Sequence, residues 1–370
     1  MTASRTGLVL SGGGARGAFQ VGVWERLRTD PRFAGPLVLS GTSAGAINAA
    51  MIAAGKSPDE MMTFWDGLAD DLPIRLAPGL FESAVAAMAS VTFEQSLHWF
   101  QTAETWATLV RRVIERFPPT PARVLGALLE MVFTERFDVV MDVIDSLKTP
   151  SLVDAQRLRE RLVGVLGERL TTGEHDLAIS AVDAESGQVV RFVSRATPIM
   201  AAQATEYIVP PHGLTIDMVM ASASIPVLFP PTEIDGRKFW DGGLLVNTPL
   251  GPVVGLGAEQ VVTVLVTELA ERRPALDRLG VTLERTVDTL LENSYLADRK
   301  LLLERNRLAG LGVEGYQEIT LYKPIRPGAE VDLNVGAFLF FKHEVLREMR
   351  EAGRVAADRW LADPAPEDRL

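Results

Sequence analysis

The sequence predicts an α/β fold in which a central, mostly parallel sheet carries helices on both faces. Two short apolar runs, Gly7–Ser11 and Leu37–Ser40, resemble buried strands, and helical patterns follow them at Ala15–Arg28 and Ala44–Ala54. Strands that alternate with helices at this spacing pair in parallel through right-handed crossovers. An apolar share of 47% with 23% charged residues fits a globular chain that buries a full core.

Two antiparallel hairpins are expected in the second half of the chain. Leu177–Val182 and Gln188–Ser194 flank a Ser-Gly turn, and Thr232–Ile234 and Arg237–Trp240 flank an Asp-Gly turn. The elements expected after them are, in order, a helix with Thr248 at its N-cap and Pro249 at its first position, a strand at Gln260–Val266, a helix at Leu276–Leu308, a strand at Tyr316–Lys323 and a helix at Phe338–Leu361.

The expected organisation is one domain over residues 1–370. Its core covers 7–72 and 151–266, a helical insertion covers about 73–150, and an extension of helices and one strand covers about 270–361. The insertion is predicted from apolar residues at helical spacing, with few strand signals between the prolines.

The predicted insertion is apolar on several helical faces around Leu128 and Phe133. A helix of this kind is either buried or in contact with lipid. Ordinary packing against the core and a lid over an acyl-chain pocket therefore both remain open. Acidic residues interrupt the apolar run, so we do not expect it to span a bilayer.

Composition excludes several classes of function. A net charge of −11 argues against a nucleic-acid partner, because phosphate contacts need clustered Lys and Arg. The chain has no cysteine, and none of its four histidines pairs at the spacing of a metal-binding helix, so neither a metal nor a cofactor is expected. No signal-peptide pattern is present, which makes a cytoplasmic location the default expectation and leaves a peripheral membrane location open.

The first motif that carries chemistry is a glycine-rich loop between a strand and a helix, Gly12 to Gly17 (Gly-Gly-Gly-Ala-Arg-Gly). Glycines there expose several backbone N–H groups at a helix N-terminus, which favours a developing negative charge. The loop suits an oxyanion hole, and its spacing also matches a dinucleotide fingerprint. That fingerprint requires an acidic residue at the end of the next strand, where Ser40 to Ser43 (Ser-Gly-Thr-Ser) stand instead.

The second motif is Gly41 to Gly45 (Gly-Thr-Ser-Ala-Gly), again between a predicted strand and a predicted helix. A nucleophile elbow places a serine on a strained turn of this kind, and small neighbours let the strand and the helix approach. Ser43 is the candidate nucleophile, and the N–H of Ala44 is a candidate oxyanion donor.

The third motif is Asp241-Gly242-Gly243, which follows Phe239-Trp240. Asp-Gly is in most sequences a turn signal. Asp241, however, ends its predicted strand and is followed by further apolar residues, so a functional carboxylate and a simple turn both remain open.

Taken together and in this order, the three motifs resemble those of the patatin-like phospholipases. The similarity extends to Ala221 through Pro226 (Ala-Ser-Ala-Ser-Ile-Pro), Asn247 and Pro249. It covers residues 7–72 and about 151–266 and is weak elsewhere. It implies a three-layer patatin-like fold.

By matching position, the resemblance implies a Ser43–Asp241 dyad, with Gly13 and Gly14 as oxyanion donors. It also implies a serine acyl hydrolase of the phospholipase A or lysophospholipase type, with a lipid ester as substrate and a transient contact with a membrane interface left open. Two interpretations of Arg16 remain: it orients the loop or a substrate phosphate, or it is a solvated residue at a helix start.

Two alternatives compete with the dyad. An α/β-hydrolase triad follows the chain order Ser, Asp, His, and His343 is the one histidine after Asp241. That histidine falls in a predicted amphipathic helix, where a surface position is the ordinary expectation. A catalytically inactive lipid-binding protein is the other alternative, although every required side chain is present.

Overall fold

The computed structural model describes residues 4–70, 75–76, 151–201, 205–267, 279–328 and 341–367. The chain divides into two compact units. The first consists of Met1–Pro73, Gln156–Pro226 and Pro231–Leu370, and the second of Ile74–Ala155 and Val227–Pro230. The expected insertion at about 73–150, with Leu128 and Phe133, lies almost entirely outside the described residues.

The described strands of the first unit form one mixed sheet with the order β11-β10-β1-β2-β5-β6-β7, to which β9 and β8 are added beside β5. β1, β2, β5 and β10 pair in parallel, whereas β6 and β9 are antiparallel to β5. The predicted parallel core of the sheet is therefore confirmed. The strands are β1 (Thr6–Leu10), β2 (Val38–Gly41), β5 (Asp176–Asp183), β6 (Val189–Val193), β7 (Glu206–Ile208), β8 (Thr232–Ile234), β9 (Arg237–Asp241), β10 (Gln260–Val264) and β11 (Thr320–Leu321).

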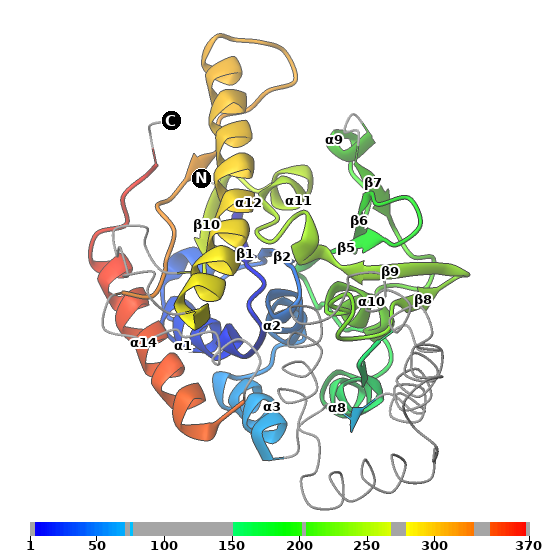
Figure 1. The fold of residues 1–370 in the computed structure, drawn as a ribbon. Helices are drawn as coiled ribbons and strands as arrows, with labels where there is room; N and C mark the ends of the chain where they lie inside the picture. Colours follow the sequence, from blue (N-terminus) through cyan, green and yellow to red (C-terminus); the bar gives the residue numbers. More distant parts are fainter. Residues whose placement is uncertain are drawn as a thin grey trace, which may run out of the picture. The chain divides into compact units, whose positions relative to one another are not determined.

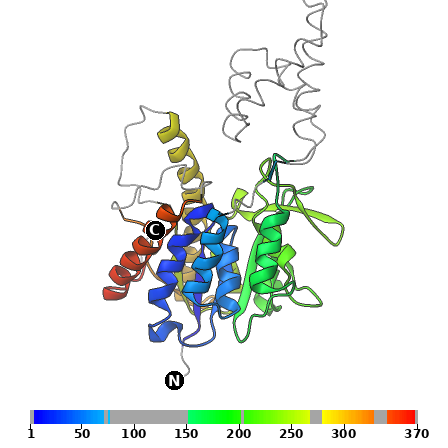
Figure 2. The same ribbon diagram turned by 90° about the horizontal axis from the view of Figure 1, so that it is seen from below.

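Helices cover both faces of this sheet (Figure 1). One face carries α1 (Gly17–Leu27), α2 (Ala44–Ala53), α3 (Pro58–Asp70), α8 (Gln156–Leu166), α10 (Ile216–Ser222) and α14 (His343–Ala362). The other carries α11 (Leu250–Gly255) and α12 (Leu279–Gly310), and shorter pieces are α9 (Pro198–Ala201), η1 (Gly14–Arg16), η2 (Pro31–Phe33) and η3 (Gly242–Leu244). In Figure 2, α1, α2 and α3 lie side by side along their face. None of the described helices combines the length and the apolar character that a membrane span requires.

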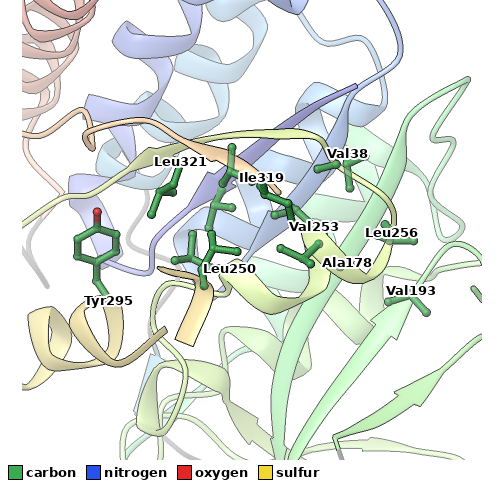
Figure 3. Packing of buried hydrophobic residues seen from close by; sticks show 14 of the residues in the cluster. Val38, Ala178, Val193, Leu250, Val253, Leu256, Tyr295, Ile319 and Leu321 are labelled. Carbon is green, nitrogen blue, oxygen red and sulfur yellow. The ribbon is translucent and has the colours of Figure 1, made fainter. Parts of the chain in front are cut away.

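A cluster of buried apolar residues lies between the sheet and the helices α11 and α12 (Figure 3). Val38, Ala178 and Val193 contribute from the strands, Leu250 and Val253 from α11, and further members come from α12 and from the chain before β11. This packing holds α12 against the face that β1, β2, β5 and β10 present.

The second unit contributes one described strand pair. β3 (Arg75–Leu76) lies antiparallel to β4 (Val153–Asp154).

Most of the expected elements are found, and the bounds of several differ, among them those of α11, β11 and α14. Pro249, not Thr248, is the N-cap of α11, because its ψ of 82° lies outside the helical region and the helix starts one residue later. The strand expected at Tyr316–Lys323 is reduced to β11 at the sheet edge. α14 begins at His343, since Lys342 still has an extended backbone.

A buried polar network joins α1, α2 and α3 behind the candidate nucleophile. The Asn48 amide donates to the Gly17 carbonyl at 2.9 Å and to the Gln20 amide oxygen at 2.8 Å, and it accepts from the Trp65 indole at 3.0 Å. Gln20 in turn donates to the Ser11 carbonyl at 2.6 Å. Every amide of this network therefore has partners in place of water.

We expect Asn48→Ala to destabilise the protein by roughly 2–3 kcal/mol, because it leaves buried donors and acceptors without partners. The measurement is urea unfolding followed by circular dichroism. Thr63→Ala on the exposed side of α3 is the matched control and should stay within about 0.5 kcal/mol of the parent. Equal stability of Asn48→Ala and the parent would show that the network is dispensable.

Candidate active site

The candidate site forms where two strands meet end to end along one edge of β5. β2 runs parallel to β5 and ends with Gly41 opposite Ile179. β9 approaches from the other direction and ends with Asp241 opposite Ala181. The carboxyl ends of β2 and β9 thus face each other across one residue of β5, and the second and third motifs are brought together there.

Ser43 occupies the strained turn that the second motif predicts. Its φ of 53° and ψ of −125° lie where non-glycine residues are rare, a conformation that costs roughly 1–3 kcal/mol. The turn also needs small neighbours: a Cβ on Gly45 would lie 2.2 Å from the Leu10 carbonyl oxygen, and one on Gly41 would lie 2.4 Å from the Gly45 carbonyl. Ser43 is the N-cap of α2, so its side chain lies at the helix N-terminus, where a negative charge is favoured.

Ser222 holds the turn from the other side. Its hydroxyl accepts from the Ser43 N–H at 3.0 Å and donates to the Ser180 carbonyl at 2.6 Å. Ser180 is the residue of β5 between the ends of β2 and β9. Sequence reasoning gave Ser222 no role beyond its place in the Ala221–Pro226 segment, because a buried serine in a run of small residues carries no local signal of its partners.

Asp241 lies beside Ser43 and is 5% exposed. Its carboxyl accepts from the Gly243 N–H at 2.7 Å, and it lies close enough to the Ser43 hydroxyl for that group to lower its pKa. Burial raises the pKa of Asp241 to about 7, although Gly243 and Ser43 both favour the carboxylate and act in the opposite direction. At neutral pH this carboxyl therefore exists in both protonation states.

The glycine-rich loop lies against the serine turn. A Cβ on Gly12 would stand 3.2 Å from the Cβ of Ser43, and the Gly12 N–H donates to the Asn247 carbonyl at 3.0 Å. Gly14 has a φ of 57°, which favours glycine. In the described part of the chain, no acceptor binds the N–H groups of Gly13, Gly14 or Ala44. Among the described residues, these three N–H groups are therefore the candidates for binding a negatively charged oxygen.

Arg16 of the same loop is buried, with 1% of its surface exposed. Its guanidinium donates to the Asp288 carboxylate at 2.7 Å and to the Val266 carbonyl at 3.3 Å. The interpretation of Arg16 as a solvated residue at a helix start was wrong, because Asp288 of α12 draws the side chain into the protein. Its place favours orientation of the loop over contact with a substrate phosphate.

The described histidines lie apart from the dyad. The ring nitrogens of His343 bond to Asp66 and Asp70 at 3.1 and 2.8 Å, and these carboxylates raise its pKa. His175 accepts from the Leu37 N–H. No described histidine ring contacts Ser43 or Asp241, and so the geometry gives the Ser-Asp-His343 alternative no support; His98 lies outside the described residues. No three described His, Asp or Glu side chains gather into a possible metal site.

A sequence model described as patatin-like phospholipase matches residues 8–254, which is more than half of the chain. The chain belongs to the patatin-like phospholipase family. It is accordingly a hydrolase that acts on carboxylic esters of lipids, and its mixed sheet with helices on both faces is the patatin-like α/β fold. The family match ends before β10, so α12 lies outside it.

Solved structures similar to this patatin-like chain include two bacterial proteins. VipD from Legionella pneumophila is 17% identical with a TM-score of 0.44, and the alignment covers 99% of this chain and 68% of VipD. ExoU from the type III secretion system of Pseudomonas aeruginosa, in complex with SpcU, is 18% identical with a TM-score of 0.36. That alignment covers 98% of this chain and 53% of ExoU, so the chain spans about half of ExoU's length. No curated protein gave a match.

The raised pKa of Asp241 predicts that the ionised carboxylate costs stability. The folded-state pKa of about 7 exceeds the unfolded value near 3.9, so stability should be lost as pH rises from about 4 to about 7. Asp241→Asn removes this cost. Its free energy of unfolding relative to the parent should therefore increase between pH 5 and pH 8, by up to a few kcal/mol, in urea titrations.

Asp183→Asn is the control for this measurement. Hydrogen bonds from the Ser186 backbone and from Arg237 lower the pKa of Asp183 to about 2, so this group is ionised at both pH values. Its stability difference from the parent should not change between pH 5 and pH 8. A flat difference for Asp241→Asn as well would contradict the raised pKa.

Proposed function

We propose that the protein is a serine lipid acyl hydrolase, of the phospholipase A or lysophospholipase type, in which Ser43 is the nucleophile and Asp241 the general base. The single observation that carries the proposal is the meeting of the buried Ser43 and Asp241 side chains at the ends of β2 and β9, with Ser43 on a strained strand-to-helix turn. A serine hydroxyl needs an adjacent base to attack an ester, and Asp241 is in contact with it.

In the acylation step, the Ser43 Oγ attacks the ester carbonyl carbon while its proton passes to the Asp241 carboxylate. An ordinary aspartate with a pKa near 3.9 is a weak base for this transfer, whereas a pKa of about 7 matches neutral pH. The tetrahedral intermediate carries its negative charge on the former carbonyl oxygen, which the N–H groups of Gly13, Gly14 and Ala44 bind. The intermediate collapses, the C–O bond to the alcohol breaks, and Asp241 returns the proton to the leaving alkoxide.

In the deacylation step, water attacks the acyl-Ser43 ester. Asp241 accepts one proton from this water, and the same three N–H groups bind the second oxyanion. The bond to Ser43 then breaks, Asp241 gives the proton back to the Ser43 Oγ, and a fatty acid is released. The cycle consumes one ester and one water and restores both side chains.

The surroundings of the dyad support a lipid as the substrate. Ser43 and Asp241 are only 7% and 5% exposed. Leu244 and Leu245, which follow Asp241 by a few residues, are 52% and 51% exposed. Apolar side chains at the surface beside a buried ester-cleaving pair favour substrates with acyl chains, such as phospholipids or acylglycerols.

The test of the nucleophile is covalent labelling. A fluorophosphonate should label Ser43, as mapped by mass spectrometry of peptides, and Ser43→Ala should lose both the label and ester hydrolysis. Ser224 is the internal control, because it is also buried but its hydroxyl bonds to the Met220 carbonyl and to Thr232. A label on Ser224 in place of Ser43 would overturn the assignment.

The test of the base is the pH dependence of kcat/KM on a soluble ester. Activity should rise about tenfold per pH unit below an apparent pKa of about 7 and level off above it, since the carboxylate form of Asp241 is required. Asp241→Asn should remove activity, whereas His343→Ala should keep the profile because its ring is bound to α3. Loss of the profile in a folded His343→Ala protein would favour a triad.

A further inference from the structure

Helix α12 reaches the glycine-rich loop from outside the family match. Asp288 lies near its N-terminal end, more than thirty residues beyond the last matched position. Its carboxylate pairs with the guanidinium of Arg16 at 2.7 Å, and both side chains are buried. The partners are 272 positions apart in the chain.

This ion pair is one of several contacts that hold the loop with the Gly13 and Gly14 N–H groups. The backbone N–H of Arg16 donates to the Gly13 carbonyl at 3.2 Å, so the orientation of Arg16 and that of the Gly13 peptide are linked. The guanidinium also donates to the Val266 carbonyl. A Cβ on Gly13 would stand 2.2 Å from the Cγ2 of Val266, so the loop is pressed against the chain that follows β10.

A second contact ties the same helix to the same loop. The Ser294 hydroxyl accepts from the Asn247 N–H at 2.8 Å, and the Asn247 carbonyl accepts from the Gly12 N–H at 3.0 Å. α12 therefore holds the loop at Gly12 through Asn247 and at Arg16 through Asp288.

Stability alone does not explain a buried pair of this kind. Replacing a buried ion pair by well-packed apolar side chains is often neutral or stabilising. What the pair supplies is position: it holds the Arg16 Nη1 against the Asp288 carboxylate and the Val266 carbonyl. Oxyanion donors must be placed to within a few tenths of an ångström.

We propose that Asp288 is a positioning residue for ester hydrolysis: by holding Arg16 it fixes the Gly13 and Gly14 N–H groups where the oxyanion forms. This inference rests on the proposed function. Asp288 touches neither the substrate nor Ser43 and acts through the loop.

The test compares Asp288→Asn and Asp288→Glu with the parent. Asp288→Asn should lower kcat about 10- to 100-fold, as expected for misplaced oxyanion donors, and leave KM near the parent value. The apparent pKa near 7 in the pH profile should not move, because Asp241 is untouched. Asp288→Glu should recover part of kcat, since it restores the charge.

The matched control is Glu367→Gln. Glu367 pairs with Arg299 of the same helix at 2.6 Å and accepts from Tyr295, but it anchors the C-terminal segment and not the loop. This variant should lower the melting temperature and keep kcat. An equal loss of kcat in Glu367→Gln would mean that any loosening of α12 reduces activity, and it would overturn the specific role of Asp288.

A double variant, Arg16→Met with Asp288→Leu, guards against failure to fold, because an apolar pair is tolerated in such positions. We expect it to melt close to the parent and to show the same loss of kcat as Asp288→Asn. Parent-like kcat in Asp288→Asn or in the double variant would overturn the proposal.

Fluorophosphonate labelling of the parent tests the proposed function separately. If the proposed function is wrong, the parent itself is not labelled at Ser43; if only the role of Asp288 is wrong, the parent is labelled there.

Discussion

The site depends on two strands ending at one point on the edge of a third. β2 and β9 pair with successive parts of β5, and Gly41 and Asp241 lie opposite residues two apart on that strand. Because one strand is parallel and the other antiparallel, their carboxyl ends meet, and Ser43 comes to lie beside Asp241. The Ser180 carbonyl between them accepts from Ser222, which in turn receives the Ser43 N–H, so the same junction fixes the strained turn. A shift of β9 by one residue would move the Asp241 side chain to the opposite face of the sheet.

Burial both creates the proposed base and lowers stability. An aspartate that water could reach would keep a pKa near 3.9 and bind a serine proton weakly. Enclosure beneath the serine turn raises the pKa of Asp241, and the Gly243 N–H limits the shift by bonding the carboxylate. The strained φ of Ser43 adds a second local cost. Well-packed surroundings such as the Asn48 network have to offset both, as is common where function and stability compete.

Local pattern was sufficient for part of this site. The strand–turn–helix around Ser43 and the hairpin turn at Asp235 and Gly236, whose φ values are 50° and 78°, involve neighbours in the chain, so composition and spacing predict them. Asp241 could be separated from an ordinary turn residue only through the resemblance, because its partner Ser43 is distant in sequence. The pairing of Arg16 with Asp288 was missed for the same reason, and the start of α11 was misplaced because Thr-Pro fits two cap registers.

A buried carboxylate also explains why the proposed mechanism needs no histidine. In a Ser-His-Asp triad the imidazole supplies a base with a pKa close to neutral, and the aspartate only orients it. Here burial gives the carboxylate itself a pKa of about 7, so the proton has a suitable acceptor beside Ser43. His343 has no part in the proposed dyad. Its ring links α14 to α3 through Asp66 and Asp70. A dyad has no second side chain that assists the base, so the oxyanion donors must supply much of the transition-state stabilisation. The placing of the glycine-rich loop by α12 is therefore important for the proposed catalysis.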